Sequence, residues 1–323
     1  PKTAHKLMEA VRLGDQAAVA RAAGKNPRLA ELLAFLDTLR AMPPQPGPVL
    51  ERVIAHHTPY LMEKYPEDYP RRLTGLEIRW GGVFEPSPKA VRAALLQRRL
   101  TGLHRHGKYL IARFEDDAGT ASFLMIHLRM TGQFLAQPDY EPDRHVHVTF
   151  DFDGHAVHFR DVRKFGRLTL VEDGTSPAAL AHVGPDMMTV KTADWLARVR
   201  GRGAPFKSVL LDQGVAAGLG NIYADESLFL AGVHPLARPR DLDEAVLREV
   251  LRRAKQVLRL AIRHGGTTFL DFRNFHGQPG NFRRKLRVYG RGGEPCRDCG
   301  TTIERMVIGG RSSSWCPACQ PER

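Results

Sequence analysis

The spacing of hydrophobic residues along the chain changes twice. From about residue 7 to residue 42, apolar residues recur at helical spacing and predict amphipathic helices. From Leu76 onward, short apolar runs alternate with polar positions and turn residues, which predicts antiparallel strands. We expect these strands at residues 76–80, 100–104, 108–114, 122–127, 145–152, 156–159 and 167–171, with a helix at about residues 88–97. Beyond residue 186 the helical period returns, most clearly over residues 242–263.

These changes predict an α+β protein in four parts. A helical N-terminal segment, residues 1–48, ends in a proline-rich stretch that reads as a stiff linker or turn. An antiparallel β-sandwich domain follows at residues 49–185, because period-2 alternation with hairpin spacing favours antiparallel over parallel sheets. Residues 186–290 form a helical domain, and residues 291–323 form a small C-terminal module.

The four cysteines of the chain all lie in the C-terminal module. They form two C-x-x-C turns, and this spacing predicts one structural zinc ion held by Cys296, Cys299, Cys316 and Cys319. The alternative is two disulfides, which is less favoured because no secretory signal is present. Between the turns, residues 303–308 and 311–315 flank Gly309 and Gly310, so we expect a β-hairpin with Arg311 at its tip.

Charge narrows the class of partner. The chain has 323 residues and a formal net charge of +13, which favours a polyanion and above all nucleic acid. The alternative is that the charge serves only solubility. No apolar run approaches the roughly 18 residues that a membrane helix needs. We therefore expect a cytoplasmic, nucleoid-associated monomer that does not bind membranes.

A glycine-rich turn joins two predicted helices in the helical domain. Gly218-Leu219-Gly220 is followed directly by Asn221. Such a turn presents backbone N–H groups and an amide side chain at the start of a helix, where phosphate binds readily. The alternative is that the glycines permit helix packing and Asn221 only caps the helix.

Several motifs in one order resemble the formamidopyrimidine-DNA glycosylase family over about residues 73–320. The stretch Leu211 to Glu226 resembles its helix-two-turn-helix motif, and the C-terminal hairpin resembles its zinc finger. His106-Gly-Lys108 resembles the strand with a phosphate-binding lysine, and residues 265–291 resemble the region of the loop that closes over an oxidised purine. Three further segments resemble parts of the family that contact DNA. His127 to Gly132 resembles the loop whose methionine fills the space left by an everted base, and Arg144 to His147 resembles the strand start whose first histidine contacts DNA. Asp161 to Gly166 resembles the loop whose arginine and phenylalanine wedge into the duplex, with Val162 in place of the usual proline.

The resemblance implies a base-excision repair DNA glycosylase with AP-lyase activity. Its substrates would be oxidised purines such as 8-oxoguanine and formamidopyrimidines in damaged duplex DNA. Taking a base out of the stack requires a backbone clamp and side chains that fill the gap. The implied clamp is Lys108, Asn221 and Arg311, and the implied gap-filling residues are Met130, Arg163 and Phe165. Further implied DNA contacts are His127, His145, Arg202 and Lys207.

The same residue types also have ordinary structural interpretations. Met130 and Phe165 would suit a hydrophobic core, although both stand near glycine turns at strand ends. The histidines at positions 127 and 145 could be hydrogen-bonded structural groups. Arg202 and Lys207 could be surface cations.

The N-terminus departs from the family pattern. The family nucleophile is an N-terminal proline followed by two glutamates, whereas this chain reads Pro1-Lys2-Thr3-Ala4-His5. Pro1 is the candidate catalytic amine, with Lys108 and Arg311 as its partners at the site. Pro59 begins a second partial match, but an internal proline nitrogen is an amide.

Three explanations stay open for this departure. Pro1 reaches the site with an acid such as Glu9 or Glu63 as a new partner, another nucleophile operates, or the lyase chemistry is lost. An unusual or incorrectly assigned N-terminus is a further alternative. A binding protein that recognises lesions without cleaving them is the main alternative function. A zinc-containing RNA-binding or ribosome-associated protein is a third, and it would leave the gap-filling residues without a role.

Overall fold

The computed structural model describes residues 71–136, 140–172, 174, 178–269, 272–275 and 277–322. The chain divides into two units, Pro1–Pro48 and Val49–Arg323, and all described residues belong to the second. The helices predicted for residues 1–48 therefore lie outside the described residues, as do Pro1, Glu9, Pro59 and Glu63.

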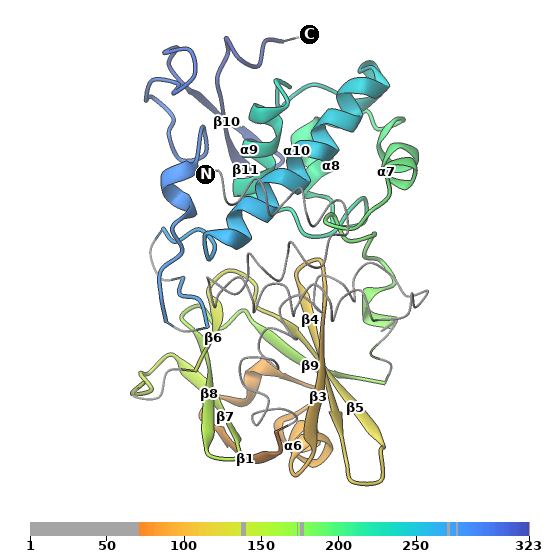
Figure 1. Ribbon diagram of the computed structural model, residues 1–323, viewed down its shortest axis with the longest axis vertical. Helices are drawn as coiled ribbons and strands as arrows, with labels where there is room; N and C mark the ends of the chain where they lie inside the picture. The colour runs from red at the N-terminus through yellow and green to blue at the C-terminus, as the bar shows by residue number, and fades with distance from the viewer. Residues whose placement is uncertain are drawn as a thin grey trace, which may run out of the picture. The chain divides into compact units, whose positions relative to one another are not determined.

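Two β-sheets form the first part of the described chain (Figure 1). One has four strands in the order β1 (Leu73–Ile78), β7 (Val146–Phe152), β8 (His155–Asp161) and β6 (Gly132–Leu135). The other has five, in the order β2 (Phe84–Glu85), β9 (Arg167–Val171), β5 (Ala121–His127), β4 (Tyr109–Glu115) and β3 (Arg99–His106). The short helices η2 (Gly81–Val83), α6 (Pro88–Leu95) and η3 (Ala178–Leu180) accompany them.

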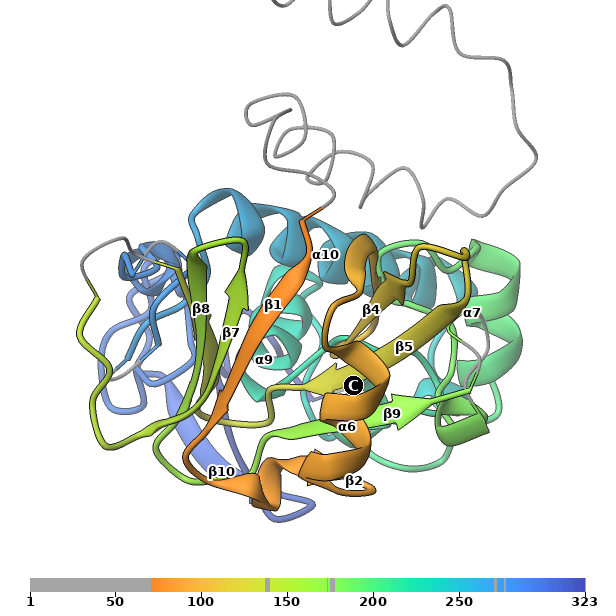
Figure 2. The ribbon, with the colours of Figure 1, turned by 90° about the horizontal axis from the view of Figure 1, so that it is seen from below.

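The two sheets pack face to face as the predicted sandwich. Figure 2 shows β1, β7 and β8 in one layer and β4, β5 and β9 in the other. One hydrophobic core fills the space between the layers, and its buried members include Leu73, Val148, Phe159, Phe114 and Leu168. Apolar residues at every second position of a strand point to one face, so burying that face fixes the register.

Two details of the sheets differ from the sequence prediction. All pairs were expected to be antiparallel, but β2 pairs parallel with β9 through Phe84 and Leu168. Strand β6 was not predicted, because it has only four residues and includes a buried polar residue, Gln133. Its pairing with β8, from Gly132 opposite Asp161 to Leu135 opposite His158, defines it as a strand.

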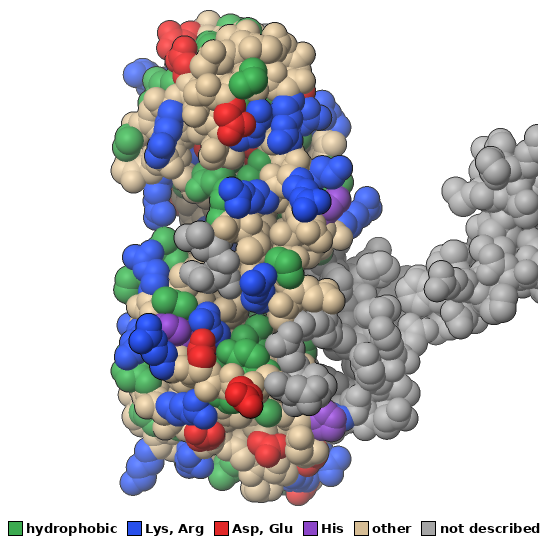
Figure 3. Space-filling model, turned by 90° about the vertical axis from the view of Figure 1, so that its left-hand side faces the viewer, with side chains coloured by type: hydrophobic (Ala, Val, Ile, Leu, Met, Phe, Trp, Pro, Cys, Tyr) green, Lys and Arg blue, Asp and Glu red, His purple; other side chains and the backbone are tan. Residues whose placement is uncertain are grey.

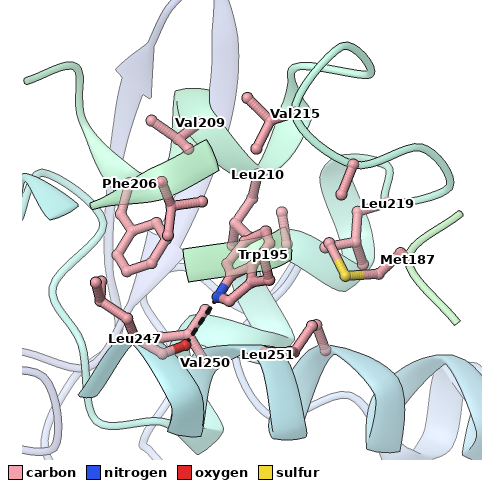
Figure 4. Packing of buried hydrophobic residues seen from close by; sticks show 14 of the residues in the cluster. Met187, Trp195, Phe206, Val209, Leu210, Val215, Leu219, Leu247, Val250 and Leu251 are labelled. Atoms are coloured by element: carbon pink, nitrogen blue, oxygen red, sulfur yellow. Dashed lines mark hydrogen bonds between the residues drawn. The ribbon is translucent and has the colours of Figure 1, made fainter. Parts of the chain in front are cut away.

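The helical domain contains α7 (Thr192–Val199), α8 (Phe206–Leu211), α9 (Asn221–Leu230), η4 (Pro239–Asp241), α10 (Glu244–Arg263) and η5 (Phe282–Lys285). Its core is apolar and tightly closed around Trp195, which is fully buried (Figure 4). The indole Nε1–H donates to the carbonyl of Leu247 at 3.0 Å, so the one polar atom of this side chain is satisfied. Within the described part of the chain, no helix is long and apolar enough to cross a membrane.

The C-terminal module contains the predicted hairpin. Strands β10 (Glu304–Ile308) and β11 (Arg311–Trp315) pair antiparallel, with Ile308 opposite Arg311. Gly309 and Gly310 form the turn at φ +55° and +73°, backbone angles that favour glycine. The prediction of a hairpin with Arg311 at its tip is therefore confirmed.

Two buried carboxylates of helix α9 hold this module and the segment that leads into it. The carboxylate of Glu226 accepts the backbone N–H groups of Arg287, Val288 and Tyr289 at 2.8, 2.9 and 2.9 Å. Burial raises the pKa of Glu226, and these three donors oppose that shift. Oδ2 of Asp225 accepts the N–H of Ser314 at 3.1 Å. Asp225 thus holds the hairpin to α9 across 89 residues of sequence, and Glu226 holds the segment that leads into the zinc module.

Candidate functional site

Lys108 lies in the turn between β3 and β4, at the end of the sheet nearest the helical domain (Figure 1). The preceding Gly107 has φ +58°, and a Cβ added there would lie 2.5 Å from the Cβ of Ala217. Only glycine therefore lets the turn approach the helix-two-turn-helix loop this closely. The buried carboxylate of Asp186 accepts the N–H of Gly107 at 2.7 Å and both terminal nitrogens of Arg105 at 2.7 and 3.1 Å. Asp186 thus fixes the turn that carries Lys108.

The N-terminus of α9 faces this lysine. Nζ of Lys108 lies 3.8 Å from the position that a Cβ on Gly220 would take. Gly220 occupies the cap position, so Asn221 is the first residue of the helix and does not cap it as the alternative interpretation held. Nδ2 of Asn221 donates to the carbonyl of Ser312 at 2.9 Å, and its Oδ1 is buried without a partner among the described residues. Asn221 therefore connects the helix start to the zinc hairpin.

Arg311 places a second positive charge beside Lys108. Partial desolvation lowers the pKa of Lys108, and the charge of Arg311 lowers it further. Within the described residues, neither cation has an ion pair. Two cations held together by the fold without a counterion provide a site for an anionic ligand. Lys108, Asn221 and Arg311 come from three parts of the chain, and the structure brings them together.

The structure does not support the prediction that Lys207 contacts DNA. Its side chain is fully buried, where it pairs with Asp225 and donates to the carbonyl of Asn221 at 3.1 Å. Burial lowers the pKa of Lys207 and raises that of Asp225, and their ion pair opposes both shifts. An apolar stretch of α8, with Phe206 and Val209 in the core, carries this lysine inward. Lys207 therefore positions Asn221 from behind and is not a surface cation.

Arg202 is exposed, and its contacts lie away from the clamp candidates. Its guanidinium is 3.6 Å from Asp212 and donates through Nε to the carbonyl of Arg198 at 3.3 Å. A DNA contact by Arg202 stays a prediction.

Met130, Arg163 and Phe165 form one exposed cluster on the loops after β5 and β8. Met130 is 67% exposed and Phe165 44%, so neither is a core residue. The Arg163 guanidinium lies 4.6 Å from the Phe165 ring centroid, and its Nη1 lies 3.1 Å from Sδ of Met130. Such a group can enter a gap in stacked bases, since it combines apolar surface with a cation.

Asp161 organises the two loops that carry this cluster. Its carboxylate is fully buried; Oδ2 accepts the N–H of Gly166 at 2.7 Å and Oδ1 accepts the N–H of Arg163 at 3.2 Å. Oδ1 also accepts the hydroxyl of Thr131, which follows Met130. One carboxylate therefore fixes both loops, while Arg129 and Lys164 adopt positive φ of 55° and 57° to make the turns.

The two predicted histidines flank these groups. His127 ends β5, and its ring centroid lies 4.6 Å from that of Tyr109. Desolvation, with the charges of Arg129 and Lys108, lowers the pKa of His127 to about 4, so its ring is neutral at pH 7. His145 precedes β7, and its carbonyl accepts the N–H of Asp161 at 2.9 Å. Both positions lie beside the candidate site, and their contact with DNA stays a prediction.

The segment after α10 spans from the helical domain to the sandwich. At its start, the hydroxyl groups of Tyr223 and Thr267 lie 3.0 Å apart. Further along, the N–H of Arg273 donates to the buried amide of Gln133 at 2.8 Å, and the N–H of Ala136 donates to the carbonyl of Phe275 at 3.0 Å. The segment is thus anchored at the end of β6.

The four cysteines meet at one point. Their sulfur atoms all lie within 4.8 Å of one another, and those of Cys299 and Cys316 are 3.4 Å apart. A disulfide needs about 2.05 Å, so this geometry excludes the alternative of two disulfides. Four thiolates at these separations match the tetrahedral four-cysteine site of structural zinc. Cys296, Cys299, Cys316 and Cys319 are the ligands.

Sequence reasoning missed the acids that position the site. Asp161, Asp186 and Asp225 are buried and accept hydrogen bonds from groups near the clamp or the exposed cluster. Asp186 follows Gly184-Pro185 in a turn, and an acid there gives no pattern that predicts a partner 79 residues away.

The fold and site define a protein with a four-cysteine zinc site, two neighbouring cations beside a helix N-terminus, and an exposed cluster of apolar and cationic side chains. Family models match three consecutive regions: the formamidopyrimidine-DNA glycosylase N-terminal domain at residues 48–168, the H2TH domain of that enzyme at 183–272, and the zinc finger found in FPG and IleRS at 293–321.

Curated relatives and solved structures agree with these matches. A formamidopyrimidine-DNA glycosylase of Herpetosiphon aurantiacus is 41% identical over 72% of this chain and 86% of its own length. One of Desulfitobacterium hafniense is 38% identical over 77% and 92%. A Lactococcus lactis Fpg mutant in complex with Fapy-dG-containing DNA has a TM-score of 0.71 at 28% identity, covering 82% of this chain and 98% of that one. The MutM (Fpg) protein of Thermus thermophilus has a TM-score of 0.69 at 32% identity, covering 81% and 96%.

The chain belongs to the formamidopyrimidine-DNA glycosylase family of base-excision repair enzymes, which act on damaged DNA. This confirms the predicted family, the fold class and the single structural zinc.

Proposed function

We propose that this protein acts as a monomer that excises oxidised purines, 8-oxoguanine and formamidopyrimidines, from duplex DNA. The observation that carries the proposal is the meeting of Lys108, Arg311 and the start of α9. Two unpaired cations and a helix N-terminus supply the donors that a kinked phosphate backbone needs. Met130, Arg163 and Phe165 then fill the gap left by the everted base.

Excision would be followed by cleavage at the abasic site. In this proposal the Pro1 nitrogen, as a free amine, attacks C1′ of the damaged nucleotide, and the C1′–N bond to the base breaks as the base takes up a proton. The nitrogen gives up its proton, the C1′–O4′ bond then opens with protonation of O4′, and the Schiff base forms as an iminium ion. Loss of the flanking phosphates by β- and then δ-elimination follows. An α-amino group with a pKa near 8 has a usable unprotonated fraction at neutral pH.

A non-cleaving lesion-binding protein is the second candidate, and one observation favours it. The match to the family's N-terminal domain begins at residue 48, an internal position where a proline nitrogen is an amide. The clamp and the exposed cluster would serve recognition equally well without an amine.

Borohydride trapping separates the two candidates. The protein is incubated with a duplex that contains 8-oxoguanine, and a reduced covalent adduct is expected. Its disappearance when Pro1 is blocked or extended supports the Pro1 mechanism, while its persistence assigns the step to another amine. Lesion-specific binding without adduct or strand scission would support the non-cleaving protein. Equal affinity for undamaged duplex and structured RNA would overturn both.

A further inference from the structure

Exposed cations gather where the C-terminal half of α10 meets η5. They are Arg259, Arg263, Arg283, Arg284, Lys285 and Arg297, here called the α10–η5 basic surface. Figure 3 shows the side of the molecule on the left of Figure 1, where η5 lies, and Lys and Arg side chains spread over its upper half. Among the described residues, none of the six forms an ion pair.

The first half of α10 differs from the second. Arg248 pairs with Glu244, and Arg252 pairs with Glu249 at 2.6 Å, so charge there is balanced within the helix. Toward the end of the same helix, Arg259 and Arg263 lie one turn apart without such partners. Favourable interaction with the helix dipole accounts for a cation in the last turn. It does not account for three consecutive cations on η5.

Packing brings η5 against the end of α10. The N–H of Asn281 donates to the carbonyl of His264 at 2.9 Å, and the Phe282 ring lies 5.8 Å from the His264 ring. Nη1 of Arg297 donates to the carbonyl of Arg284 at 2.9 Å, which adds the zinc module to the same surface. Exposed cations of η5 and of the zinc module therefore lie next to the end of α10, and a concentration of positive charge favours a polyanion as partner.

This surface continues from the clamp. The buried Phe282 ring packs at 6.0 Å against Tyr223, which lies in the first turn of α9, two residues after Asn221. The cations of η5 therefore lie beside the helix start at which the phosphate backbone is expected to bind. The position of η5 next to the start of α9 and the positive charge of its side chains both favour duplex DNA as the partner of this surface.

We propose that the α10–η5 basic surface binds the phosphates of the duplex beyond the Asn221 contact and so lengthens the DNA footprint on one side of the lesion. The proposal rests on the DNA-binding part of the proposed function and not on catalysis. It involves no base contact, so it adds affinity that is independent of sequence and of damage.

The test uses undamaged duplex DNA and the full chain. A triple variant, Arg259→Gln with Arg284→Gln and Lys285→Gln, removes three exposed cations. The plot of log affinity against log salt concentration is expected to become shallower by about 2 to 3, because each lost phosphate contact removes about 0.9. The effect is expected with a long undamaged duplex. With a duplex that carries one 8-oxoguanine, which fixes the position of the protein, the effect should shrink when the flank on one side of the lesion is shortened.

A matched variant separates this surface from net charge. Arg240→Gln with Arg248→Gln and Arg252→Gln removes the same charge from cations that are paired with acids. It is expected to keep the original slope. Equal slopes for the two variants would overturn the proposal, as would stronger binding of duplex RNA than of duplex DNA.

Two further measurements keep failures distinguishable. The zinc content and the midpoint of thermal unfolding report whether the triple variant folds. If the triple variant does not fold, the single variant Lys285→Glu takes its place in the salt titration. An unchanged salt slope for Lys285→Glu overturns the proposal. Excision of 8-oxoguanine at low salt is expected to persist in the triple variant. If excision is absent from the original protein as well, the proposed function fails while the footprint proposal is still decided by the slopes.

Discussion

Asp186 and Arg105 form a two-point ion pair, at 2.7 and 3.1 Å, between the helical domain and strand β3. The same carboxylate holds the N–H of Gly107, so the pair sets the position of the turn that carries Lys108. The buried carboxylate of Asp186 thus determines where the candidate phosphate-binding cation Lys108 lies.

Replacing Asp186 by Asn should weaken DNA binding by about 1 to 2 kcal/mol, because one charged acceptor of the turn is lost. Binding would be measured at fixed salt for Asp186→Asn, Lys108→Gln and the double variant. The two effects should not add, since both act through the Lys108 contact. Glu249→Gln, which removes a half-buried helix acid paired with Arg252 and Arg253, is the control, and additive losses would contradict the positioning role.

Arg311→Ala should weaken DNA binding by about 1 to 3 kcal/mol while the hairpin keeps its zinc. Arg311 stands at the tip, and the four cysteines hold the metal elsewhere in the module. Titration of DNA and metal analysis of the same sample would check both statements. Arg305 is an exposed arginine on the paired strand and provides the matched control. The Arg305→Ala variant should bind DNA more tightly than the Arg311→Ala variant. Loss of metal on Arg311→Ala would show that this arginine is structural.

Asp161→Asn should reduce excision of a base more than cleavage at a preformed abasic site. The carboxylate fixes both loops of the exposed cluster, and a preformed abasic site needs no base eversion. We expect about a ten-fold loss for the base, which corresponds to about 1.4 kcal/mol in the transition-state free energy. Asp151→Asn, on the neighbouring strand, is the control. Equal losses on the two substrates would argue against a role in eversion.

Protonation of His127 should make the free energy of unfolding depend on pH. Its folded pKa of about 4 lies below the ordinary value near 6.5, so the folded state binds fewer protons than the unfolded state between those pH values. The free energy of unfolding should therefore fall as the pH drops from about 6.5 to about 4. Urea titrations at both ends of this window should show a smaller fall for His127→Gln. If the free energy of unfolding of His127→Gln falls as much as that of the original protein, other groups cause the fall. The variant His155→Gln, which replaces an exposed histidine, serves as the comparison.

Removing zinc should unfold the hairpin and abolish tight DNA binding while the β-sandwich stays folded. The metal supplies folding free energy to a module whose own buried cluster is small, with Ile303 and Cys316 among its members. Chelation followed by proteolysis would show cleavage confined to about residues 291–323. Cleavage throughout the chain would mean that the zinc module also stabilises the other domains.

Local spacing explains which predictions from the sequence held. The zinc ligands are close in sequence, and a C-x-x-C turn places two thiolates together in any fold. The period of α10 and the alternation of β4, β5 and β7 are equally local, so their ends fall within about two residues of the prediction. Strand β6 and the parallel β2–β9 pair were missed because pairing partners distant in sequence define them.

The sequence by itself determined most of the described elements and the metal ligands, because each depends on residues within a few positions of one another. The set of candidate side chains came from the order of motifs that the chain shares with the family. Only the tertiary structure decided which candidates face a ligand. It buried Lys207 against Asp225, left Met130 exposed, and brought Lys108 beside Arg311. Burial and long-range charge depend on contacts across 60 to 90 residues, such as Asp225 with Ser314 at a separation of 89, and no local pattern encodes them.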